Sequence, residues 1–310
     1  MHTVHIAAVF PGQGSQKMGM ARDFYDTSPH ARAVFEEVSE ALALDMTTLC
    51  FTDDARLDLT AFTQPAILTA EISIYRALVA EYGLTVDVFG GHSLGEYAAL
   101  VAAGVIPLAE AARLVRRRGE AMQAAVPVGI GAMLAVTGRD LDLATIRAAA
   151  TASTVDLANL NSPQQVVLSG TTEGIAAAAV ALDAALPGAR LTRLTVSAPF
   201  HSRLMAPIEA DFRDLLGASS ACWSTAAADR VLCNFTGGFY PADSAAALVD
   251  GLTRQISGAV RWTDNMAAVP AGATIYEIGP RRPLRGFFRA LGVTVTAITN
   301  RTTARRAFAE

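Results

Sequence analysis

The residues from Val86 to Ala103 predict a strand, a tight turn and a helix in close succession. The apolar residues at 86, 88 and 89 are typical of a buried strand, the glycines at 90 and 91 interrupt it, and a run of helix formers begins at Ser93 and stops at Gly104. Gly91-x-Ser93-x-Gly95 fits the nucleophile elbow, a strained turn that holds a serine hydroxyl clear of the sheet. We therefore expect an α/β fold in which Ser93 is a nucleophile.

The start of the predicted helix also suggests how an oxyanion would be stabilised. Free N–H groups and the positive end of the helix dipole would face the place where an acyl oxygen gains negative charge. The N–H of Leu94 is the expected first donor. The alternative is a glycine-bracketed turn without chemistry, because the short motif also occurs by chance.

An early loop is a second candidate for the same role. Residues 4–10 predict a first buried strand, and residues 11–16 form a glycine-flanked loop whose spacing does not match a phosphate-binding P-loop. The N–H of Gln13 is the expected second oxyanion donor, and a plain turn remains the alternative.

The order of predicted strands and helices changes in the middle of the chain. Between residues 128 and 196 the pattern predicts strand, helix, strand, a turn at 161–163, strand, helix and strand, which is the ferredoxin-like order. We expect an inserted small domain at 128–196, with residues 1–127 and 197–310 forming one large α/β domain. A cleft between the two domains is the expected ligand site.

The large domain is predicted from shorter patterns on both sides of the insertion. Before it we expect helix at 20–44 with a start at 28–29, a surface loop at 52–59, and helices at 65–82 and 108–125; after it, helix at 205–216, strand at 230–235, helix at 245–257, strand at 274–277, helix at 282–291 and strand at 293–298.

A nucleophilic serine needs a base that takes its proton. Of the five histidines, His201 in a Pro-Phe-His-Ser loop is the candidate left by elimination, with a capping role as the alternative. No aspartate stands out as a third member. A backbone or side-chain carbonyl could orient the imidazole instead, since a neutral Nδ1–H needs only an acceptor.

Composition excludes several classes of protein. Hydrophobic residues make up 52% and charged residues 17% of the 310 positions, which is typical of a globular chain, and a net charge of −4 gives no reason to expect nucleic acid. No apolar run is long enough to span a bilayer, and the three cysteines lack metal-type spacing. We expect a cytoplasmic protein without a membrane segment, a disulfide or a metal.

Six motifs together closely resemble the malonyl-CoA:acyl carrier protein transacylase family, which includes the acyltransferases of fatty acid and polyketide synthases. They occur in order and span nearly the whole chain, at residues 10–16, 91–97, 118–122, 159–170, 199–202 and 277–280. The resemblance implies a hydrolase-like large domain with the ferredoxin-like domain inserted. It also implies malonyl-CoA and an acyl carrier protein as partners, and we expect a monomer that needs no cofactor.

The resemblance also implies residue roles. Ser93 and His201 would form a dyad rather than a triad, with the imidazole oriented by the main-chain carbonyl of Gln255, and the N–H groups of Gln13 and Leu94 would form the oxyanion hole.

Specificity is implied by three further residues. Arg118 would bind the free carboxylate of the malonyl group, because a planar guanidinium pairs with a carboxylate through two hydrogen bonds. Met122 lies four residues further on the same helix face, and the bulk of Phe200 would exclude a 2-methyl group.

A cluster of arginines near the C-terminus is the candidate docking surface for the acidic carrier: Arg281, Arg282 and Arg285. Three other functions are alternatives. Arg118, the inserted domain and the position of His201 count against a serine esterase or thioesterase, and Arg118 also counts against an editing hydrolase or a transferase for uncharged acyl groups. Intact Ser93 and His201 count against a non-catalytic carrier-binding protein. The sequence does not choose between fatty acid and polyketide synthesis.

Overall fold

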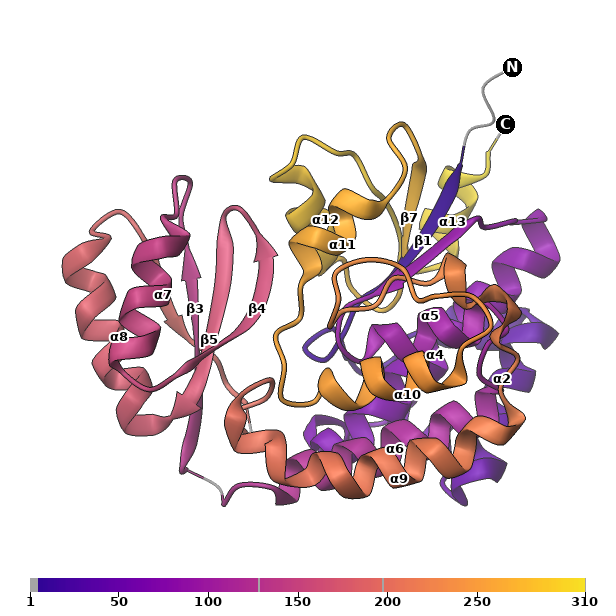
Figure 1. Ribbon diagram of the computed structural model, residues 1–310. Helices are drawn as coiled ribbons and strands as arrows, with labels where there is room; N and C mark the ends of the chain where they lie inside the picture. Colours follow the sequence, from indigo (N-terminus) through magenta and orange to yellow (C-terminus); the bar gives the residue numbers. More distant parts are fainter. Residues whose placement is uncertain (1–4, 128, 197, 310) are drawn as a thin grey trace.

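The computed structural model describes residues 5–127, 129–196 and 198–309 of the chain. Its first sheet consists of β1 (Ile6–Phe10), β2 (Val88–Gly91), β7 (Thr274–Ile278) and β8 (Thr296–Ile298). All neighbours are parallel and the strand order is β2-β1-β7-β8 (Figure 1). The first strand was predicted from Val4, which lies outside the described residues. The parallel arrangement confirms the α/β prediction.

The α-helices differ in length from six to 23 residues. In chain order they are α1 (Arg22–Thr27), α2 (Pro29–Leu42), α3 (Met46–Phe51), α4 (Thr60–Tyr82), α5 (Gly95–Ala102), α6 (Leu108–Ala124), α7 (Leu143–Ala152), α8 (Thr172–Ala185), α9 (Glu209–Ser219), α10 (Ala245–Arg254), α11 (Trp262–Ala268), α12 (Pro283–Arg289) and α13 (Arg301–Ala307). None of the helices in the described ranges has the length and apolarity needed to cross a membrane.

Strand β1 lies between two hydrophobic cores. Ala8 and Phe10 pack in the larger core, which includes residues of α2, α4, α5 and α6, whereas Ala7 and Val9 pack against α11 and α12 on the other face (Figure 1). Side chains alternate between the faces of a strand, so a parallel strand covered on both sides needs an unbroken apolar sequence. This sheet fixes the carboxyl ends of β1 and β2, where the two candidate oxyanion donors follow.

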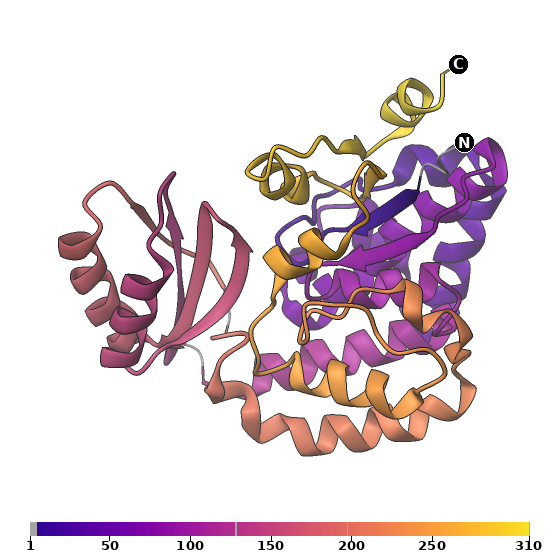
Figure 2. The same cartoon turned by 45° about the horizontal axis from the view of Figure 1, so that its top comes forward.

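Residues 129–196, here called the small unit, form a second sheet. It contains β3 (Gly131–Thr137), β4 (Asp156–Ser162), β5 (Gln165–Thr171) and β6 (Arg190–Arg193), all antiparallel, in the order β4-β5-β3-β6. Helices α7 and α8 cover the face turned away from the rest of the molecule (Figure 2). Along β3, Ala132, Leu134 and Val136 face these helices, and Met133 and Ala135 belong to the larger core. The predicted domain boundaries at 128 and 197 lie outside the described residues.

Two prolines explain where predicted helix boundaries are wrong. Helix α4 begins at Thr60 rather than at Pro65, which lies inside it. Proline has no N–H, so the carbonyl of Ala61 loses its helical donor, and Arg116 Nη1 supplies a replacement at 3.1 Å. Pro207 lies in a 3₁₀-helix, η2 (Arg203–Ile208), so the helix predicted from residue 205 begins as α9 only at residue 209.

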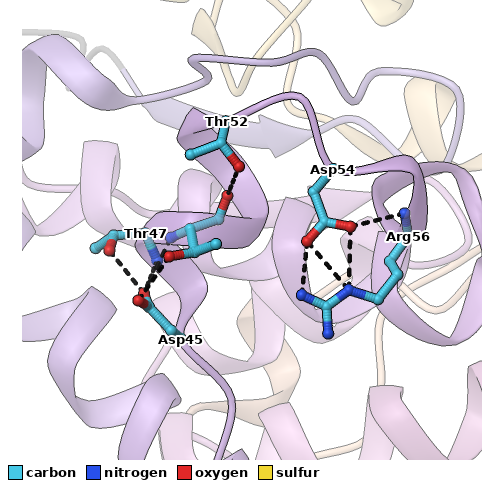
Figure 3. Close-up of polar contacts among 6 residues, drawn as sticks. Asp45, Thr47, Thr52, Asp54 and Arg56 are labelled. Carbon is cyan, nitrogen blue, oxygen red and sulfur yellow. Dashed lines mark hydrogen bonds and ion pairs between the residues drawn. The ribbon is translucent and has the colours of Figure 1, made fainter.

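The predicted surface loop at 52–59 contains a 3₁₀-helix, η1 (Ala55–Asp58). The Asp54 side chain caps it by accepting from the N–H of Arg56, and it also pairs with the Arg56 guanidinium at 2.6 Å (Figure 3). Asp45 caps the preceding α3 in the same way by accepting from the N–H of Thr47 (Figure 3). These caps stabilise the first turns of two short helices, of which only η1 lies in the acid-rich segment.

The predicted strand at 230–235 is wrong. Only one parallel bridge joins this segment to the first sheet, between Val231 and Phe89, and the N–H of Leu232 donates to Phe89 O at 2.9 Å. Beyond this point the chain leaves the sheet direction, and the Asn234 side chain turns toward the β2–α5 turn. The predicted turn at 161–163 also begins two residues later, at residue 163, because β4 continues through Ser162.

Candidate active site

The turn between β2 and α5 has the geometry of a strained elbow. Ser93 has a φ of 53°, which is uncommon for a residue with a side chain. A Cβ added to Gly91 would lie 1.9 Å from Gly95 O, and one added to Gly95 would lie 2.2 Å from Phe10 O. Only glycine permits such close backbone contacts. The helix predicted from Ser93 begins at Gly95, because Ser93 itself is left-handed and its N–H donates to Asn234 Oδ1 at 2.6 Å.

Ser93 and His201 lie within hydrogen-bonding distance. Ser93 Oγ is 2.8 Å from His201 Nε2, and His201 Nδ1 is 2.7 Å from the main-chain oxygen of Gln255. A carbonyl oxygen only accepts, so Nδ1 carries the hydrogen and Nε2 presents its lone pair to the serine. Helix α10 ends at Arg254, earlier than the predicted residue 257, and the Gln255 carbonyl at the helix end is therefore free for the imidazole.

His201 is held as a neutral base. Burial and the nearby charge of Arg118 lower the pKa of His201 to about 3, so the imidazole is uncharged at neutral pH. Its side chain is almost fully enclosed, and its φ of 56° is again left-handed. Both members of the pair are thus fixed by backbone conformations that cost free energy, a pattern typical of functional sites.

Arg118 on α6 points at the serine. Its Nη2 donates to Ser93 Oγ at 3.1 Å and to Gln255 Oε1 at 2.8 Å, and its Nη1 donates to Gln64 Oε1 at 2.9 Å. The residue is only 1% exposed, and burial lowers its pKa from the usual high value. Within the described residues no carboxylate forms an ion pair with it. A buried cation beside a nucleophile is suited to a substrate that brings its own negative charge.

Two backbone N–H groups face the same region. In the described part of the chain, neither Gln13 N–H nor Leu94 N–H donates to a protein acceptor, and both residues line the cavity above Ser93. A Cβ on Gly12 would lie 2.4 Å from His92 O, so the absence of a side chain there allows the β1 loop to approach the elbow. This arrangement could bind an oxyanion.

The cavity has a volume of about 790 Å³ and lies between the first sheet and the small unit. Met122 and Phe200, both nearly buried, contribute to its wall. Strand β6 stops at Arg193 instead of continuing to the predicted residue 196, and residues 194–196 line the cavity. The full lining is Gln13, Gly14, Gln16, Asp58, Gln64, His92, Ser93, Leu94, Arg118, Met122, Met133, Asn159, Leu194, Thr195, Val196, Phe200 and His201.

The three candidate docking residues lie apart from this cavity. Arg281, Arg282 and Arg285 are exposed at the start of α12, and among the described residues none of them forms a salt bridge. Helix α12 contacts β4, so this helix lies on the side of the first sheet that faces the small unit (Figure 1).

Sequence reasoning did not assign roles to Asn234 and Glu96. Asn234 Nδ2 donates to Gly91 O at 2.8 Å while its Oδ1 accepts from Ser93 N–H, so one amide holds both sides of the elbow. Glu96 is fully buried on α5 and hydrogen-bonds to the Gln255 side chain. A lone acid in the otherwise apolar run of α5 was the available signal for the second residue, because a buried carboxyl group requires partners.

Known acyl transferases and transacylases are similar to this chain over most of its length. The acyl transferase domain family matches residues 8–230. Malonyl CoA-acyl carrier protein transacylase of Bacillus subtilis strain 168 is 39% identical over 290 residues, covering 92% of this chain and 89% of the relative. The protein of the same name from Escherichia coli K12 is 39% identical over 301 residues, covering 94% of each chain.

Solved structures are similar over almost the full length. The malonyl CoA-acyl carrier protein transacylase of Clostridium perfringens has a TM-score of 0.90 at 33% identity, covering 98% of this chain and 96% of that one. A malonyl-transacylase solved in complex with a type II polyketide acyl-carrier protein has a TM-score of 0.91 at 36% identity, covering 98% and 99%.

Proposed function

The chain belongs to the acyl transferase family, among the malonyl CoA-acyl carrier protein transacylases, and on this premise we propose that it moves a malonyl group from malonyl-CoA to the phosphopantetheine thiol of an acyl carrier protein. The product serves fatty acid or polyketide biosynthesis. The observation that carries the proposal is the Arg118 guanidinium, buried without a carboxylate partner among the described residues and 3.1 Å from Ser93 Oγ.

The first half-reaction forms an ester on the enzyme. Ser93 Oγ attacks the thioester carbon while His201 Nε2 takes the hydroxyl proton. The oxyanion that forms is stabilised by the N–H groups of Gln13 and Leu94. When it collapses, the carbon–sulfur bond breaks, CoA leaves with the proton held by His201, and the malonyl group remains on Ser93.

The second half-reaction reverses these steps with a different thiol. His201 Nε2 takes the proton of the carrier's phosphopantetheine thiol, the sulfur attacks the ester carbon, and the same two N–H groups bind the oxyanion. The serine oxygen leaves and regains a proton from His201. Because His201 is neutral at physiological pH, it is ready to act as base in both halves.

Substrate selection follows from the cavity wall. Arg118 pairs with the distal carboxylate of the malonyl group, whereas an uncharged acyl group would leave this buried guanidinium without a charged partner. Met122 and Phe200 bound the space around the acyl chain, and the bulk of Phe200 disfavours a 2-methyl group.

We propose the corresponding domain organisation on similar grounds. A hydrolase-like large domain, residues 1–127 and 197–310, is supported by the parallel sheet with covered faces. A ferredoxin-like small domain, residues 128–196, is supported by the β-α-β-β-α-β order and the strand order β4-β5-β3-β6.

The proposed chemistry needs no metal or organic cofactor, since one chain supplies nucleophile, base and oxyanion donors. A monomer suffices for the same reason. The three free cysteines, Cys50, Cys222 and Cys233, fit a reducing compartment such as the cytoplasm.

Acyl transfer is tested by intact mass after brief incubation with malonyl-CoA. We expect a single malonyl adduct that persists in buffer and disappears when a holo-carrier protein is added, with malonyl appearing on the carrier. Acetyl-CoA run in parallel should give less adduct, because it cannot pair with Arg118. Rapid release of free malonate without a carrier would instead indicate a thioesterase.

The carrier is proposed to dock on Arg281, Arg282 and Arg285, since an acidic partner complements an exposed basic cluster. Replacing all three by alanine should raise the KM for the carrier about tenfold at low salt, on the scale of a few exposed charge pairs. Acylation by malonyl-CoA should change less than about twofold. The matched control is alanine at the exposed Arg305 and Arg306 of α13. Equal carrier KM values in the wild type and the triple variant would refute this surface.

A further inference from the structure

The Gln255 side chain contacts both the Arg118 guanidinium and the main chain of the elbow. Its Oε1 accepts from Arg118 Nη2 at 2.8 Å, and its Nε2 donates to Ser93 O at 2.9 Å and to Glu96 Oε2 at 2.5 Å. It is completely buried, so these contacts have no competition from bulk solvent. The side chain thus has a role separate from that of its main-chain oxygen, which accepts from His201.

The orientation of this amide matters because its two ends differ. A guanidinium only donates, so Arg118 needs Oε1 and would be repelled by Nε2. Rotation of the amide by half a turn would exchange the two ends and break the contact with Arg118. The groups that accept from Nε2 therefore determine whether Arg118 stays aligned toward Ser93 Oγ.

Glu96 is one of those groups, and its carboxylate accepts hydrogen bonds from three described residues, one of which is Gln255. Its Oε2 also accepts from the N–H of Asn234 at 3.3 Å, and its Oε1 accepts from the Tyr240 hydroxyl. Burial raises the pKa of Glu96 to about 7, while the hydrogen bonds from Tyr240 and Gln255 and the charge of Arg118 oppose this rise. A buried carboxyl group is costly to keep, and in the described structure it is linked to Arg118 through one amide.

We infer that Glu96 is a positioning residue for malonyl selection: by accepting from Gln255 Nε2 it holds Oε1 toward Arg118, and so aligns the guanidinium for the substrate carboxylate. The inference rests on the proposed malonyl transfer. It assigns Glu96 no contact with the substrate. Its effect should appear in the choice between acyl groups rather than in the attack by Ser93.

The test is the ratio of malonyl to acetyl acylation rates, measured by rapid quench and intact mass. We expect Glu96→Ala and Gln255→Met each to lower this ratio about tenfold, the scale of one hydrogen bond to a charged group. Gln255→Met keeps the main-chain oxygen that orients His201. Because Glu96 acts through Gln255, the double variant should show no further fall.

Two matched variants separate positioning from a general structural role. Glu96→Gln retains an oxygen that can accept from Gln255, so it should restore most of the ratio lost in Glu96→Ala. Tyr240→Phe removes a hydrogen bond to the same carboxyl group without touching Gln255, and its ratio should stay within about twofold of wild type.

The outcomes are distinct from those of the function test. If wild type forms no malonyl adduct, the proposed function itself fails. If wild type forms the adduct but Glu96→Ala and Gln255→Met lower malonyl and acetyl acylation in equal proportion, the inference is wrong and Glu96 only supports the elbow. An additive fall in the double variant would also overturn it, because the two residues would then act separately.

Discussion

Ser93→Ala is expected to abolish the malonyl adduct completely. In the proposed mechanism the hydroxyl oxygen forms the ester, and no other nucleophile described in the structure occupies its place between His201 Nε2 and Arg118 Nη2. Loss of a serine nucleophile reduces the rate of acyl transfer by more than about 10⁴-fold in comparable sites. The measurement is intact mass after incubation with malonyl-CoA, followed by transfer to a holo-carrier protein.

The variant should fold normally, which makes the result interpretable. The elbow is fixed by Asn234 and by the close contacts of Gly91 and Gly95, none of which involves the serine hydroxyl. Alanine has the same Cβ and tolerates the left-handed φ as poorly as serine does, so the backbone strain is unchanged. Circular dichroism and the melting temperature provide the control. A malonyl adduct that persists at full rate in a folded Ser93→Ala protein would contradict the assignment.

Much of the fold could be predicted because it depends on local patterns. The strand before Ser93, the apolar run of β1 and the β-α-β-β-α-β order of the small unit all follow from periodicity within short windows. The predicted start of α4 was wrong because a residue far away in the sequence replaced a local hydrogen-bond donor. Pro65 is tolerated within α4 because Arg116 donates to the carbonyl that proline leaves unpaired, and no local pattern in the sequence shows that contact.

Residues of the candidate site could likewise be predicted only where a local sequence motif marks them. A glycine-serine-glycine turn has a recognisable spacing, so Ser93 could be identified from its neighbours. The role of Asn234 could not be predicted. Its segment has the apolar sequence of a strand, but it leaves the sheet where the Asn234 amide contacts the elbow, and these two parts are far apart in the sequence. Gln255 was named for its main-chain oxygen, but its side-chain contacts with Arg118 and Glu96 depend on three distant segments meeting in the fold.

Arg118→Ala is expected to invert the preference of the enzyme between malonyl and acetyl groups. In the proposed complex Arg118 makes a bidentate hydrogen bond to the substrate carboxylate. Its loss removes about 3–6 kcal/mol of transition-state binding free energy, the scale of two charge-assisted bonds, so malonyl acylation should fall about 10²- to 10⁴-fold. Acetyl-CoA has no carboxylate, and its acylation rate should stay within about tenfold of wild type. Rapid-quench acylation with each substrate gives both numbers.

The matched variant Arg118→Lys separates charge from geometry. Lysine keeps the positive charge but cannot donate to Gln64, Gln255 and the substrate as one planar group, so malonyl acylation should lie between those of wild type and alanine. Alanine leaves Gln64 Oε1 and Gln255 Oε1 without their donor but also removes a buried charge, and these effects on stability oppose each other. The melting temperature of each variant therefore accompanies the rates. If malonyl and acetyl acylation fall by the same factor in a folded Arg118→Ala protein, the guanidinium supports the nucleophile rather than the substrate, and selection of the malonyl group must come from elsewhere in the cavity.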